Sequence, residues 1–198
     1  MPGLPEHLPA GEEMLWQGRP DTWRLAVEAC GLYWVAGYFA LLVIWRVGVS
    51  STLMPMGEAI LTAVPFVLLG FVAAGIVYVI AWAQARATVY TVTGARVVMR
   101  VGAALPVTYN LPFSKVENAA LDLRSGGTGT IALQVSQQAK LSYMMMWPHI
   151  RPWYMRRPEP ALRCIPDAAR VAALLAGAAE THVSQPVLTH VGDAVAAE

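Results

Sequence analysis

The chain has 198 residues, of which 56% are hydrophobic and 14% are charged, and its formal net charge is +1. Soluble domains carry about 25% charged residues, so this composition argues against an ordinary soluble protein and favours one with membrane segments. The two cysteines, Cys30 and Cys164, lie far apart and form no Cys-x-x-Cys motif. This excludes structural zinc, thioredoxin chemistry and covalently attached haem, and we expect no disulfide.

The first 25 residues are polar and rich in proline. Acidic residues such as Glu6, Glu12 and Glu13 stand where a secretory signal peptide has basic ones, so we expect no cleaved leader. The cluster from Gly11 to Gly18 is interpreted either as a short strand or as a segment lying at the membrane surface. We assign residues 1–25 to a cytoplasmic lead-in.

Two uncharged runs follow, and together they predict a transmembrane hairpin over residues 26–85. Ala29–Trp45 has 17 residues and Ala59–Ala85 has 27. As a helix the longer run reaches about 40 Å, against a hydrocarbon core of about 30 Å. We expect helices over residues 26–46 and 58–84, and the short uncharged turn between them requires an antiparallel pair.

The distribution of charge predicts the topology. Arg19 and Arg24 precede the hairpin and Arg86 follows it, whereas only Arg46 lies between the two runs. Residues 86–172 contain 11 basic and four acidic side chains. The positive-inside rule therefore places both termini and the polar domain in the cytoplasm. The rule alone accounts for the basic excess, but that excess also suits anionic headgroups or an acidic partner.

Residues 86–180 change to a period of two, which is typical of strands. We expect strands at 88–93 and 96–101 across a tight turn, and further strands at 107–109, 116–123 and 130–135. A helix from Ala168 to about Ala179 carries one apolar stripe, with residues 171, 174, 175 and 178 spaced i, i+3, i+4 and i+7. The pattern predicts an α+β domain, an antiparallel β-sandwich or barrel closed by a C-terminal helix. Residues 181–198 are expected to form a flexible tail.

Two motifs carry a family resemblance. The segment Tyr90-Thr91-Val92-Thr93-Gly94-Ala95-Arg96, with Gly102 after it, resembles the Tyr-x-x-Thr-x-x-Arg…Gly signature of bacterial PH domains. The strings Trp147-Pro148-His149-Ile150-Arg151-Pro152-Trp153 and Arg157–Ala168 resemble the PuhB family of photosynthetic complex assembly proteins. This second resemblance covers about residues 4 to 178.

The resemblance implies a PH-like domain on a membrane hairpin and a function without catalysis. The protein would assist assembly of the photosynthetic reaction centre, with light-harvesting 1 subunits as further candidate partners. It would act as a homodimer in the inner, photosynthetic intracytoplasmic membrane of a phototrophic bacterium. The resemblance supplies no catalytic, cofactor-binding or metal-binding residues.

The segment from Met144 to Arg163 concentrates aromatic and arginine side chains, which are enriched at binding hot spots. Its four prolines preclude a regular helix or central strand, so we expect an ordered loop. Three alternatives remain open for this loop: it contacts a partner, docks against lipid headgroups, or packs internally. The candidate contact residues are Trp147, His149, Arg151, Trp153, Tyr154, Arg156 and Arg157 in the loop, and Arg96 and Arg100 on a strand.

Other function classes find little support. Neither membrane run contains a histidine, the usual axial ligand of haem and of bacteriochlorophyll, so we expect no such cofactor there. Pumps and membrane proteases place ionisable groups inside their spans, and here only Glu28 and Glu58 lie near the ends. No catalytic set or metal cluster is evident, and a membrane tether argues against nucleic acid. The alternative to an assembly factor is a general lipid-binding or membrane-scaffold PH protein.

Overall fold

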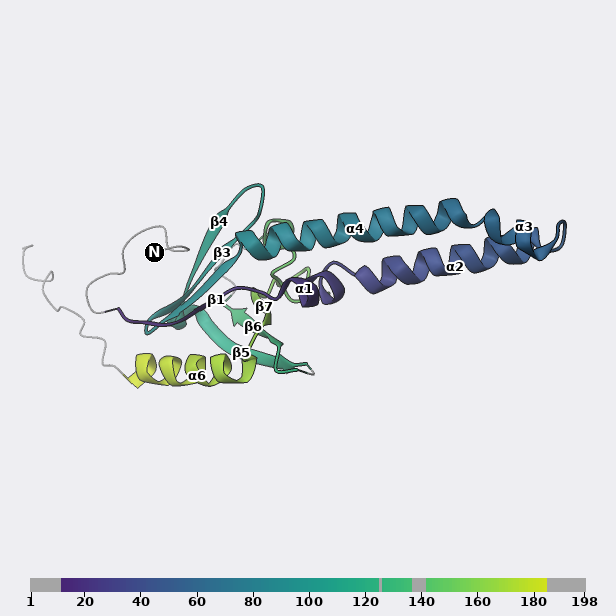
Figure 1. Ribbon diagram of the computed structural model, residues 1–198. Helices are drawn as coiled ribbons and strands as arrows, with labels where there is room; N and C mark the ends of the chain where they lie inside the picture. Colours follow the sequence, from purple (N-terminus) through teal and green to yellow (C-terminus); the bar gives the residue numbers. More distant parts are fainter. Residues whose placement is uncertain (1–11, 125, 137–141, 185–198) are drawn as a thin grey trace, which may run out of the picture.

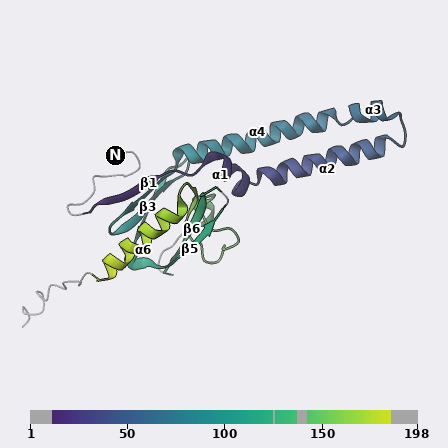
Figure 2. The same ribbon diagram turned by 60° about the horizontal axis from the view of Figure 1, so that its bottom comes forward.

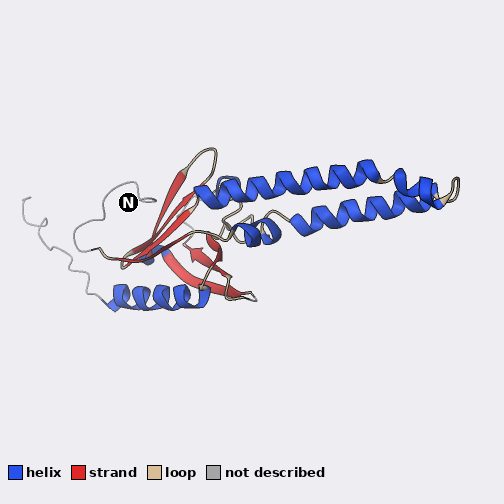
Figure 3. Cartoon of the chain, viewed as in Figure 1, coloured by secondary structure: helices blue, strands red, loops and turns tan. Residues whose placement is uncertain are grey.

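The structure is a computed structural model that describes residues 12–124, 126–136 and 142–184. A long helical hairpin projects from a domain made of two sheets and one long helix (Figures 1 and 3). We call this the β-domain. The predicted fold class, a membrane-type α-helical hairpin with an α+β domain closed by a C-terminal helix, is confirmed.

The first sheet has four antiparallel strands in the order β1-β2-β3-β4. They are β1 (Met14–Gly18), β2 (Val89–Thr93), β3 (Arg96–Val101) and β4 (Val107–Pro112). Of the two interpretations of the lead-in, the strand is therefore right, since Gly18 in β1 pairs with Tyr90 in β2. The alternating apolar residues of β2 and β3 are buried almost completely, which explains why their pattern was readable in the sequence.

The second sheet has three antiparallel strands, preceded by the short helix η1 (Phe113–Lys115). They are β5 (Val116–Leu123), β6 (Gly129–Val135) and β7 (Ala161–Ile165). Strand β7 is a correction, because we expected the proline-rich loop to continue to residue 163. The prolines end at Pro160, and the chain pairs with β6 from the next residue. A single turn, α5 (Tyr143–Met146), precedes the loop.

Helix α6 (Ala168–Ser184) closes the domain. It lies across the open side of the two sheets (Figures 1 and 2). Its apolar stripe faces the core, where Val171, Leu175 and Ala178 are buried against residues of both sheets. The helix is longer than expected, so residues 181–184, assigned to a flexible tail, are helical. The rest of the expected tail lies outside the described residues.

The hairpin consists of α2 (Leu32–Ser50), α3 (Met56–Leu61) and α4 (Val64–Ala87). The helix α2 and the run Met56–Ala87 are long and apolar enough to cross a membrane, and few of their residues are buried. Large apolar side chains consequently face outward, among them Trp34 and Phe71. Close packing joins the two arms, since a Cβ added to Gly70 would meet the Cβ of Phe39 at 3.0 Å.

Each expected membrane helix is in fact broken. The helix expected at 26–46 is replaced by α1 (Thr22–Glu28) and α2, because Gly31 adopts a left-handed conformation (φ 72°) between them. Leu25 of α1 packs with Cys164 of the β-domain, which holds this short helix against the domain. The helix expected at 58–84 is divided at residues 62 and 63 into α3 and α4, because Pro65 in the first turn of α4 has no backbone N–H to continue the hydrogen bonds of α3.

Candidate functional site

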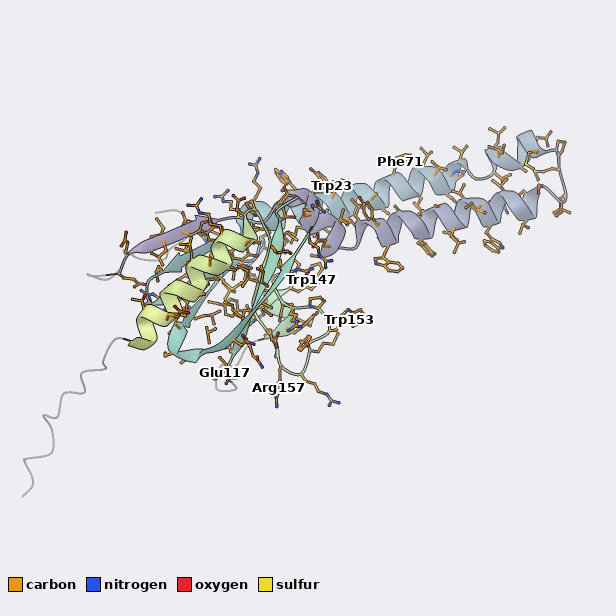
Figure 4. The ribbon with its side chains drawn as sticks, turned by 90° about the horizontal axis from the view of Figure 1, so that it is seen from below. Trp23, Phe71, Glu117, Trp147, Trp153 and Arg157 are labelled. Carbon is orange, nitrogen blue, oxygen red and sulfur yellow. The ribbon has the colours of Figure 1, made fainter. Side chains whose placement is uncertain are left out.

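Most of the candidate contact residues lie in one loop between α5 and β7. We call residues 147–157 the aromatic–arginine loop. Figure 4 shows Trp147 and Trp153 at the end of the β-domain from which the hairpin leaves, with Arg157 projecting outward. Trp153 is 88% exposed, and residues 153–157 surround a shallow surface hollow of about 450 Å³. Tyr154, Arg156 and Arg157 are also exposed.

The tip of this loop is strained as well as exposed. Trp153 has φ 70°, a left-handed conformation that is unfavourable for a bulky side chain. Such a residue costs about 1–3 kcal/mol, and an exposed indole gives back little through burial. Burial of the indole therefore does not offset the cost of this backbone conformation.

The base of the loop is fixed by a charged pair. Arg151 Nη1 donates to Glu159 Oε2 at 2.9 Å, and the bond raises the pKa of the guanidinium. The same guanidinium lies over the ring of Tyr154, 4.2 Å from its centre. The backbone N–H of Arg151 donates to the carbonyl of Glu159 at 2.9 Å. Arg151 thus contacts Tyr154 and closes the base of the loop, and its side chain is only partly exposed.

His149 is a correction to the candidate contacts, because it is completely buried. Its Nε2 lies 2.8 Å from Thr88 Oγ1 and its Nδ1 lies 2.6 Å from Tyr90 Oη. Tyr90 Oη also accepts from the backbone N–H of Arg163 at 3.3 Å, which favours the arrangement in which the hydroxyl donates to Nδ1 and the Nε2–H donates to Thr88. Burial, aided by the charge of Arg163, lowers the pKa of His149 to about 3. This histidine anchors the loop to β2.

Arg96 is a second correction, since it binds a residue of its own chain. Its Nε donates to Glu12 Oε1 at 2.8 Å and its Nη2 to Glu12 Oε2 at 2.5 Å. Thr93 donates to the same carboxylate and accepts from the backbone N–H of Arg96. The bond from Arg96 holds the pKa of Glu12 below its usual value. Arg100 on the same strand is exposed and remains available as a surface contact.

The Tyr-x-x-Thr-x-x-Arg…Gly signature therefore describes a fold, not a ligand site. Tyr90 holds the buried histidine, and Thr93 with Arg96 fastens the lead-in to the β2–β3 turn. Gly102 has φ 100°, and a Cβ there would lie 2.3 Å from the carbonyl oxygen of Leu105. Each signature residue meets a geometric requirement of the first sheet.

One group of charged residues was not singled out in the sequence. Glu28, Asp122, Arg124 and Arg163 come together with Arg151 around a small cavity beside α1. Three of them lie outside the proline-rich segment, and Arg163 became informative only once β7 was recognised as a buried strand. Among the described residues, no group of three or more His, Cys, Asp or Glu side chains is placed to hold a metal ion.

Comparison with known sequences identifies the family. The bacterial PH domain family matches residues 30–179, which is most of the chain. This chain belongs to the bacterial PH domain family. The β-domain is accordingly called the PH domain below. The match begins after β1, yet β1 completes the first sheet of the PH domain, so the lead-in is part of the folded unit.

A second comparison adds genetic context. A protein of Rhodobacter capsulatus is 45% identical over 187 residues, which cover 93% of this chain and 87% of that protein. It is described as an uncharacterized 23.7 kDa protein in the puhA 5′ region. No solved structure gives a significant match to this PH domain protein.

Proposed function

We propose that this PH domain protein is a non-enzymatic membrane assembly factor for the photosynthetic reaction centre. Light-harvesting 1 subunits are further candidate partners. The hairpin would anchor it in the inner, intracytoplasmic membrane of a phototrophic bacterium, with the PH domain on the cytoplasmic side. The relative in the puhA 5′ region supports this setting, since it suggests a photosynthesis-operon context.

The observation that carries the proposal is the exposed, strained tip of the aromatic–arginine loop. Trp153 and Arg156 project from a loop whose base is held by His149 and by the Arg151–Glu159 pair. A rigid base with an exposed aromatic and arginine tip is the composition of a binding hot spot. The loop lies beside the hairpin, where a membrane-embedded subunit would meet the PH domain (Figure 4).

The proposed mechanism is differential binding. The loop would bind an incomplete complex and lose that contact when a later subunit covers the same surface, because a ligand shifts an equilibrium only through unequal affinity for two states. No chemical step is required of the protein. The homodimer implied by the family resemblance is compatible with this mechanism and stays a prediction.

The test combines Trp153→Ala with Arg156→Ala in the phototrophic host. Truncating hot-spot side chains costs about 2 kcal/mol or more, so binding to the partner should weaken by about 30-fold and reaction-centre yield should fall. The matched control is Lys115→Ala with Leu105→Ala, which removes an exposed positive charge and an exposed apolar side chain outside the loop and outside the candidate contacts. Protein level and unfolding temperature should be unchanged in both variants.

The tagged protein should also be purified in mild detergent while photosynthesis is induced. Co-purification of reaction-centre or light-harvesting 1 polypeptides, lost in the loop variant and kept in the control variant, would support the proposal. Normal reaction-centre yield in the loop variant would rule out this surface as the contact. Recovery of the protein with lipid alone would favour the general lipid-binding alternative.

A further inference from the structure

A small cavity lies where the PH domain meets the base of the hairpin. Its volume is about 270 Å³, and it is lined by residues of α1, β5, β6, β7 and the aromatic–arginine loop. Small side chains at adjacent positions of β5 and β6 leave this space open: Ala120 pairs with Ala132, and Asp122 pairs with Thr130. The cavity also has a charged lining, formed by Glu28, Asp122, Arg124, Arg151 and Arg163.

Arg163 is the unusual member of this lining. It lies on the buried strand β7 and is only 8% exposed. Its Nη1 donates to the carbonyl oxygen of Pro148 at 3.3 Å and its Nη2 to that of Glu28 at 3.1 Å. Its Nε is buried and has no hydrogen-bond acceptor among the described residues. Among the residues that the structure describes, no carboxylate forms an ion pair with the Arg163 guanidinium.

The carboxylates of the lining are directed at a different arginine. Arg124 Nη2 lies 3.0 Å from Asp122 Oδ2, and its Nε lies 3.8 Å from Glu28 Oε2. Glu28 also lies 3.9 Å from Arg24 Nη1. A buried cation is costly unless an anion or several acceptors compensate it, and two backbone carbonyls supply only part of that compensation for Arg163.

We propose that this cavity binds the phosphate group of a membrane glycerophospholipid. A phosphate offers several charged acceptor oxygens, and guanidinium groups bind it through short, charge-assisted hydrogen bonds. It would give the Arg163 guanidinium its anionic partner, while Arg124 and Arg151 stand at the rim. The cavity shares Arg151 and Pro152 with the base of the aromatic–arginine loop but not the exposed tip at residues 153–157, and the inference does not rest on the assembly function.

The position of the cavity selects a lipid as the source of the phosphate. Glu28 ends α1, and the hairpin begins four residues later at Leu32. Trp23 and Trp153 lie on the two sides of this junction (Figure 4). Aromatic side chains are enriched at the headgroup level of a bilayer. If the hairpin spans the membrane, the cavity opens where lipid phosphates are concentrated.

Binding there would also orient the PH domain. The same guanidinium holds the last carbonyl of α1 and the Pro148 carbonyl at the base of the aromatic–arginine loop. A phosphate on Arg163 would therefore connect the hairpin, β7 and the loop to one lipid. The loop would then be held at a fixed height above the bilayer.

Native mass spectrometry of the full-length protein in mild detergent tests the proposal. The probes are phosphatidylglycerol, diacylglycerol with the same acyl chains, and glycerol 3-phosphate. We expect one phosphatidylglycerol per chain to be retained, at concentrations where diacylglycerol, which lacks the phosphate, is lost. Ala120→Leu fills the cavity and keeps every charge, and Ala120 is exposed, so the variant should fold. It should lower the retained fraction by about tenfold, a loss of about 1.4 kcal/mol.

Ala103→Leu, in the exposed β3–β4 turn, is the matched control, and Lys115→Ala, at an exposed position of η1, controls for loss of one positive charge. Both should retain phosphatidylglycerol as the unmodified protein does. Equal retention of diacylglycerol, or normal lipid retention by Ala120→Leu, would overturn the proposal. Binding of glycerol 3-phosphate without retention of the lipid would overturn the membrane as the source of the phosphate.

Discussion

At the scale of residues, two polar contacts fasten parts of the chain that are far apart in sequence. The pair of Glu12 with Arg96 joins the lead-in to the β2–β3 turn, and His149 joins the aromatic–arginine loop to β2. Their side-chain types drew attention to Arg96 and His149 in the sequence but did not reveal that both bind groups within the same chain. An arginine on an exposed strand face and one that binds a carboxylate 84 positions away look alike until the fold brings the partner close.

Arg96→Ala should destabilise the PH domain, whereas Arg100→Ala on the same strand should not. The first change leaves Glu12, whose side chain is 8% exposed, without its charged partner, and losing such a hydrogen bond costs about 1.5–3 kcal/mol. The second removes an exposed charge, with an effect within about 0.5 kcal/mol. Thermal unfolding in detergent measures both. Equal shifts would show that Arg96 acts as a surface charge and not as a clamp.

His149 should make the stability depend on pH. Its pKa is about 3 in the native protein, because of burial and then the charge of Arg163, and 6.5 when unfolded. Between these two pKa values only the unfolded chain binds the proton on His149, so protonation stabilises the unfolded chain. The contribution of neutral His149 to the free energy of unfolding is therefore complete above about pH 6.5 and is lost as pH falls toward 3. From pH 7 to pH 5 this amounts to about 2 kcal/mol.

The measurement compares unfolding temperatures at pH 7 and pH 5 for the unmodified protein and for His149→Asn, which keeps hydrogen-bonding groups but does not titrate. Carboxylates contribute equally to both proteins, so the unmodified protein should lose more stability on acidification. An identical loss in the two proteins would contradict a neutral, buried His149.

At the scale of elements, the strands with regular alternation were predictable and the interruptions were not. Strands β2 and β3 lie where the period of two predicted them, and β5 lies where a further strand was expected, although nearly all of its residues are exposed. Strand β7 was missed since it follows directly on Pro158 and Pro160. The division of α1 from α2 depends on Gly31 and on contacts of Leu25 with the PH domain, which no local pattern reveals.

The docking of α6 on the second sheet offers a prediction at this scale. A Cβ on Gly129 would lie 2.7 Å from the Cβ of Ala168 and 2.8 Å from the backbone oxygen of Asp122. Gly129→Ala should therefore push α6 or β5 aside and cost about 1–3 kcal/mol, a fall of several degrees in unfolding temperature. Gly94→Ala, where a Cβ meets nothing within 4 Å, is the matched control. Similar behaviour of the two variants would mean that α6 is not held closely at Ala168.

At the scale of the whole molecule, the hairpin separates its own tip from the PH domain, which lies at the other end of the protein. The turn between α2 and α3 lies at the tip, and β1, the PH domain and α6 lie together at the opposite end (Figure 1). The exposed apolar surface of α2 and α4 is far larger than a soluble monomer presents, which favours a bilayer around it. If that bilayer is present, the tip and the PH domain must be on opposite sides of it.

Cysteine labelling in intact cells tests this topology. Cys164 is 1% exposed, and burial raises the pKa of its thiol to about 12, so it should not react, and Cys30→Ser removes the other thiol. In that background Thr52→Cys lies at the tip and Ala103→Cys in the β3–β4 turn, both exposed. A membrane-impermeant maleimide should label the first in intact cells and the second only after lysis, as the positive-inside rule requires. The reverse pattern would place the PH domain outside the cytoplasm, and labelling of both sites in intact cells would mean that the hairpin does not span the membrane.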